Sequence, residues 1–149
     1  RPRTLCTVSF SGIPLHPLIV HVVVVLIPLA AIGMSGSVFS RNWARRYASV
    51  SVTLAGVAFA SALLAKESGE EFLATASALP EHVSAGNTMP LYAFTFFALA
   101  FVFWIVDRGI PLNRPRPTWL KLCSFFVVLA SVAATYAAVI TGHSGALSV

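Results

Sequence analysis

Four long apolar stretches, separated by short polar segments, dominate the pattern along the chain. They cover about residues 17–38, 48–65, 89–106 and 118–141. Each is close to the roughly 20 apolar residues that a helix needs to cross the hydrocarbon core of a bilayer. We therefore expect an all-α, integral membrane four-helix bundle in which residues 1–149 form a single domain.

The composition supports this interpretation and excludes a soluble domain. The chain is 57% hydrophobic and only 10% charged, whereas soluble domains carry about 25% charged residues. The net charge of +5 is explained by topology, since cytoplasmic loops of membrane proteins collect Lys and Arg. We expect contact with the lipid bilayer and no nucleic-acid partner.

The charged residues divide unequally between the two sides of the membrane. The segments that follow the first and third spans hold seven basic residues and one acidic residue, and the opposite side holds three basic and four acidic residues. By the positive-inside rule the basic segments are cytoplasmic, so both termini are extracytoplasmic. We expect a multi-pass protein of a bacterial plasma membrane. Cys6 and Cys123 then lie on opposite sides, about 30 Å of hydrocarbon apart, and cannot form a disulfide.

Two further patterns give local expectations. Residues 70–78 are predicted to form a short interfacial helix with apolar and acidic faces. Small residues recur within the second and fourth spans at a spacing that lets helices approach closely, although ordinary alanines in an apolar helix would give the same pattern. They are Gly56, Ala60, Ala130, Ala134 and Ala138.

The predicted topology brings all four histidines to one end of the bundle. His16 and His21 open the first span, His82 precedes the third, and His143 follows the fourth. Because odd spans start outside and even spans end outside, these residues all lie at the outer end. Imidazole is a common metal ligand and a usual axial ligand of haem, so we regard this end as the candidate site.

The four histidines are not equivalent. His16 and His21 are about 140° apart around a helix, so they do not share a narrow face. His21 is expected to lie deepest in the bundle, where an unpartnered polar group is costly. Each of the others has an alternative interpretation: His16 as an interfacial residue, His82 as a loop or cap residue, and His143, in TGHSGA, as part of a helix C-cap.

Three motifs together resemble the family called domain of unknown function 2231. They are HPLIVH near the start, HVSAGN in the middle and TGHSGA at the end, and the resemblance extends from Gly12 to Ala146. It implies a four-helix membrane bundle with histidines placed for haem b, and its relatives often occur beside cytochromes c and Rieske-type modules. This sequence has Val22-Val23 where relatives usually have Phe-Pro after the second His.

These observations favour a membrane electron-transfer protein that binds haem b, rather than a stand-alone enzyme. His21 and His143 are the expected axial ligands, with His16 and His82 as further cofactor-binding candidates, and the glycines beside His143 are expected to let the macrocycle approach. A cytochrome, a Rieske protein or another subunit of a redox complex would be the partner. The alternatives are a zinc or copper site held by imidazoles and a non-catalytic accessory subunit of a larger membrane complex.

Overall fold

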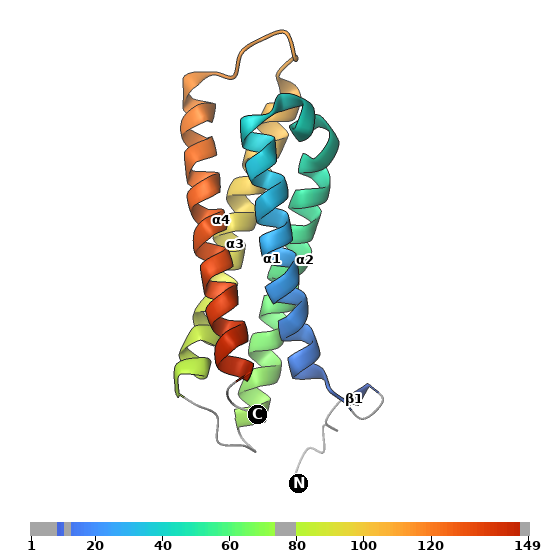
Figure 1. The fold of residues 1–149 in the computed structure, drawn as a ribbon, viewed down its shortest axis with the longest axis vertical. Coiled ribbons are helices and arrows are strands. Elements are labelled where there is room, and N and C mark those ends of the chain that lie inside the picture. The colour runs from blue at the N-terminus through green and yellow to red at the C-terminus, as the bar shows by residue number, and fades with distance from the viewer. Residues whose placement is uncertain (1–8, 11–12, 74–79, 147–149) are drawn as a thin grey trace.

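The computed structural model describes residues 9–10, 13–73 and 80–146, and four long helices account for nearly all of them. The helices are α1 (Leu15–Phe39), α2 (Arg41–Leu73), α3 (Pro80–Gly109) and α4 (Thr118–Ala146) (Figure 1). Each contains a stretch long and apolar enough to cross a membrane, which confirms the four predicted spans. Before α1, the two-residue strands β1 (Ser9–Phe10) and β2 (Ile13–Pro14) pair antiparallel.

The connection between α1 and α2 is a single residue, Ser40. Its N–H continues α1 by donating to the Gly36 carbonyl at 2.9 Å, and its hydroxyl accepts from the Trp43 N–H at 3.3 Å as an N-cap of α2. The arginine-rich segment that follows, expected as a loop before a helix from residue 48, is therefore the first two turns of α2. Hydropathy marks where a helix enters lipid, whereas the helix itself begins at its cap.

The far end of α2 also differs from expectation. The helix continues unbroken to Leu73, so residues 70–73 are its last turn and not the start of a separate interfacial helix; residues 74–78 lie outside the described residues. Likewise α3 begins at Pro80, and His82 is helical rather than in a loop. Backbone hydrogen bonding extends both helices past their apolar stretches.

The helices form a ring in which each packs against two neighbours, and α1 closes the ring against α4. Successive helices run in opposite directions, as Figure 1 shows. The α1–α2 and α3–α4 connections therefore share one end of the bundle, which we call the arginine end. The start of α1, the start of α3 and the end of α4 share the other, which we call the histidine end. Trp43, Trp104 and Trp119 lie toward the arginine end, as an interfacial aromatic belt requires.

The interior is built from a few large side chains separated by many alanines. Ile27, Met34, Phe96 and Phe103 are fully buried. Small residues let the helix backbones approach, as in other membrane bundles. The buried alanines are Ala30, Ala31, Ala44, Ala48, Ala55, Ala58, Ala62, Ala93, Ala100, Ala134 and Ala138. The outer surface carries exposed Leu, Val, Ile and Phe along every helix, which suits contact with lipid.

Candidate functional site

The histidine end gathers the four histidines from three helices. His16 and His21 lie on α1, His82 on α3 and His143 on α4, all near the end of the bundle where these helices start or finish. The side chains of His16 and His82 lie outside the part of the chain that the structure describes. The site can therefore be built from His21 and His143.

His21 faces outward, which corrects the expectation that it lies deep in the bundle. Its side chain is exposed, whereas Val23 and Ile27 are buried and form the inward stripe of α1. At about 100° per residue, His21 is about 200° around the helix from Val23. The expectation failed because α1 is apolar on all sides, so its sequence does not mark which face packs inward.

The segment around His143 is helical, which corrects the C-cap interpretation. The helix α4 runs through Gly142 and His143 to Ala146. A Cβ placed on Gly142 would lie 3.0 Å from a Val24 methyl group, so the glycine serves the close packing of α4 against α1. The space above the Gly142 backbone is occupied by Val24, and no macrocycle can approach it there.

The contact between Val24 and Gly142 also fixes how the two described histidines lie. His21 is about 60° around α1 from Val24, and His143 is about 100° around α4 from Gly142. Because the two helices are antiparallel, both rotations place the residue on the same side of the interface between α1 and α4, which we call the α1–α4 seam. The burial pattern agrees: His21 and His143 are exposed, and Val23 and Thr141, turned to the other side, are buried.

We call this outward side the seam face. Along the bundle axis, His21 is three residues closer to the histidine end than Val24, and His143 is one residue closer to that end than Gly142. Since Val24 and Gly142 are in contact, the backbones of His21 and His143 differ in height by only about 3 Å. Apolar residues continue the face toward the membrane centre, and they are exposed. These are Val25, Ile32, Tyr136 and Val139. The seam face thus carries His21 and His143 at similar heights, with an apolar surface extending from them toward the membrane centre.

The described residues contain no ready-made metal cage. Among residues 9–10, 13–73 and 80–146, no three His, Cys, Asp or Glu side chains lie close enough together to hold an ion. Cys123 is a free thiol near the start of α4, at the arginine end. Cys6 lies outside the described residues. A metal at His21 and His143 would need further ligands from elsewhere.

The arginine end holds a buried ion pair between two residues that the sequence pattern predicts only as ordinary loop charges. Arg116 Nε lies 2.7 Å from Asp107 Oδ1, and both side chains are less than a tenth exposed. The Arg116 guanidinium also donates to the Ser37 and Val38 carbonyls at the end of α1 and lies 5.1 Å from the Phe103 ring centroid. The sequence signal for this ion pair was a single acidic residue at the end of an apolar helix, followed by a segment rich in Arg and Pro.

Two arginines of α2 reach the end of α3 and the connection that follows it. Arg41 donates to the carbonyls of Ile110 and Arg114, and Arg45 donates to those of Arg108 and Ile110. Carbonyls at a helix C-terminus lack partners within the helix and carry partial negative charge. The contacts with the Arg108 and Ile110 carbonyls satisfy this helix end with cations, and together with the Arg114 contact they hold the start of α2 against the end of α3 and its connection.

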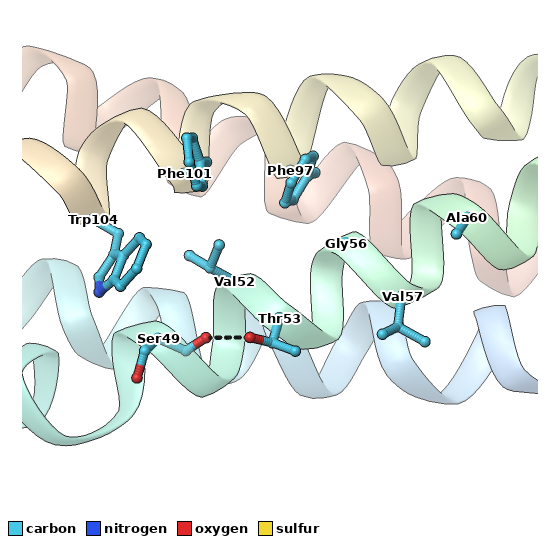
Figure 2. A pocket seen from close by; sticks show the side chains of 9 residues that line it. All are labelled: Ser49, Val52, Thr53, Gly56, Val57, Ala60, Phe97, Phe101 and Trp104. Atoms are coloured by element: carbon cyan, nitrogen blue, oxygen red, sulfur yellow. Dashed lines mark hydrogen bonds between the residues drawn. The ribbon is translucent and has the colours of Figure 1, made fainter.

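A groove between α2 and α3 leads away from this end into the membrane-spanning part of the bundle. Its cavity volume is about 430 Å³. As Figure 2 shows, α2 supplies mostly small or short side chains and α3 supplies aromatic rings. The α2 residues are Ser49, Val52, Thr53, Gly56, Val57 and Ala60, and the α3 residues are Phe97, Phe101 and Trp104. We call this hollow the α2–α3 groove.

Comparison with known proteins agrees with the sequence resemblance. A family model described as predicted membrane protein (DUF2231) matches residues 12–149, a range that includes all four helices and all four histidines. Comparisons with curated proteins and with solved structures give no match. The chain therefore belongs to the DUF2231 family of predicted membrane proteins.

Proposed function

We propose that this protein is a membrane electron carrier, or the carrier subunit of a redox complex, that binds haem b at its histidine end. The observation behind the proposal is that three helices bring every histidine of the sequence to one end of the bundle, while the arginine end has none. Histidine in this number and position is expensive in a membrane and is a functional hypothesis by default.

Imidazole nitrogens are suitable ligands for a haem iron, but the interface between α1 and α4 has no room for the macrocycle. Val24 fills the space over Gly142, so a macrocycle held by His21 or His143 would lie against the seam face. His21 and His143 lie on the same face at similar heights, so a haem held here would take one of these two residues and a second histidine from His16 or His82.

In this proposal the chain holds, shields and tunes the cofactor. When bound, the haem supplies one-electron transfer between ferric and ferrous iron. The imidazoles would hold the iron, and hydrogen bonds to their second nitrogens would tune its potential. Val25 on the seam face would keep water away from one side. A cytochrome, a Rieske protein or another subunit on the histidine side of the membrane would exchange the electron.

A bare metal ion is the second candidate, and one observation favours it. His21 and His143 lie on one face at nearly one height, so two imidazoles from neighbouring helices would be available to one zinc or copper ion. A third ligand would have to come from His16, His82 or another chain.

One preparation separates these candidates. The full chain, purified in mild detergent, is analysed for a Soret band and for bound metal, alongside His21→Ala, His143→Ala and the control Val139→Ala on the same face. We expect a Soret band that Val139→Ala retains and that at least one histidine variant loses or shifts. Colourless protein with stoichiometric zinc or copper supports the second candidate, and colourless metal-free protein overturns both in favour of an accessory subunit.

A further inference from the structure

The α2–α3 groove has the length of one leaflet. From Ser49 to Ala60 it follows α2 for eleven residues, or about 16 Å, which is about half of a hydrocarbon core of about 30 Å. Thr53, Val57 and Phe101 on its walls are exposed, so the groove opens to the bilayer. A partner helix that spans the membrane would need a groove along the whole thickness of the bilayer. An acyl chain from one leaflet needs a groove of only this length.

The groove persists because of the residues on its two walls. The Phe97 ring lies 3.1 Å from where a Cβ on Gly56 would be, so α2 and α3 are already in contact beneath the groove. Above that contact, Ala60 and Thr53 are too short to fill the space that Phe97 and Phe101 border (Figure 2). The volume of about 430 Å³ falls within the range of about 300–1,000 Å³ found for small-molecule sites.

At the arginine end the groove joins a smaller, polar hollow. Ser49 and Trp104 line both, and Arg45 and Arg108 line the polar one. The Arg108 guanidinium carbon lies 5.6 Å from the Trp104 ring centroid, and both arginine side chains are exposed. Moving outward, a molecule in the groove would meet aromatic rings, then hydroxyls, then two positive charges.

The carboxylate in the polar hollow does not cancel this positive charge. Asp107 also lines it, but that side chain is buried and paired with Arg116 at 2.7 Å. Arg108 therefore remains as the charge that faces an incoming group, with the positive charge of Arg45 beside it while the Arg45 guanidinium also donates to the Arg108 and Ile110 carbonyls. Basic pockets between membrane helices are suited to anionic lipid headgroups.

We propose that the α2–α3 groove binds one anionic phospholipid from the leaflet at the arginine end. One acyl chain lies along the groove against Phe97 and Phe101, and the phosphate is held by Arg45 and Arg108. The sequence of apolar, hydroxyl and cationic groups matches the order of groups along such a lipid. This site is at the opposite end from the histidines and does not depend on haem or metal binding.

Tryptophan fluorescence in reconstituted vesicles tests the proposal, because Trp104 borders the site. The vesicles contain phosphatidylcholine and phosphatidylglycerol, with bromine on the acyl chains of one lipid at a time. We expect phosphatidylglycerol to quench at lower mole fraction than phosphatidylcholine. Arg108→Gln and Arg45→Gln should each reduce this preference about fivefold, the effect of one basic residue near an anionic headgroup. Trp104→Phe should remove the preferential component.

Matched variants separate a specific site from general surface charge. Lys121→Gln removes a positive charge at the same end on α4 and should leave the preference unchanged. Ala60→Leu fills the deep part of the groove from an exposed position and should weaken binding without changing the charge. Equal quenching by both lipids in the unmodified protein, or a loss in Lys121→Gln as large as in Arg108→Gln, would overturn the proposal. Circular dichroism establishes that each variant is folded.

Discussion

At the scale of single residues, the Arg116 guanidinium is a buried charge that needs a hydrogen-bond partner for each of its nitrogens. All three of its nitrogens have partners: Nε contacts Asp107, and the terminal nitrogens donate to the Ser37 and Val38 carbonyls. A buried charge costs several kcal/mol unless it is paired and hydrogen-bonded, and breaking such a pair costs more than the pair itself contributes. Asp107 is therefore needed chiefly because Arg116 is buried.

Asp107→Ala should destabilise the folded protein by about 3–5 kcal/mol, since it leaves Arg116 buried without its counter-charge. Unfolding in mixed detergent and SDS, followed by circular dichroism, measures the loss. Asn113→Ala, at an exposed position of the same α3–α4 connection, is the control and should change stability by less than about 0.5 kcal/mol. Equal losses in the two variants would show that the ion pair does not stabilise the fold.

At the scale of elements, α4 packs closely against α1 because Gly142 has no side chain, and this contact closes the bundle. The two Val24 methyl carbons lie 3.0 and 3.5 Å from where a Cβ on Gly142 would be, and the first of these distances is shorter than an ordinary van der Waals contact. The same contact sets the seam face and turns His21 and His143 to one side. A residue that never touches a ligand thus determines where two candidate ligands point.

Gly142→Leu should destabilise the protein by about 1–3 kcal/mol through overpacking. Combining it with Val24→Ala should recover part of the loss, because the two positions share one space. Gly109→Leu is the matched control, since a Cβ at Gly109 meets no atom within 4 Å. The same detergent unfolding assay gives all four values, and strict additivity of Gly142→Leu and Val24→Ala would contradict direct packing between these residues.

At the scale of the whole molecule, charge and chemistry are segregated to opposite ends. The arginine end holds seven of the ten basic residues and the histidine end all four histidines. The positive-inside rule then predicts that the arginine end is cytoplasmic and that any cofactor lies toward the extracytoplasmic side.

Cysteine labelling measures this orientation. In a background with Cys6→Ser and Cys123→Ser, an impermeant maleimide should label Glu67→Cys in intact cells, and should label Asn113→Cys only after permeabilisation. Both positions are exposed, near opposite ends of the bundle. The reverse pattern would place the histidines on the cytoplasmic side.

The sequence predicted what depends on composition and failed where packing decides. The four spans and their alternation follow from apolar length, and the sharing of one end by the histidines follows from that alternation. The outward turn of His21 does not, because lipid-facing and core-facing sides of α1 are both apolar. The burial of Asp107 depends on Arg116, nine residues away across a connection, and no local pattern specifies that contact.

The hydrogen bonds from Arg116 to the end of α1 determine when during synthesis the first helix can reach its final contacts. The carbonyls that Arg116 binds belong to Ser37 and Val38, 79 and 78 positions earlier in the chain. At about 5–20 residues per second, a ribosome needs on the order of 4–16 seconds to cover that interval. The first helix is thus inserted long before its own cap exists, and during that time water at the bilayer surface must solvate those carbonyls. The first hairpin reaches its final form only after three of the four helices have been synthesised.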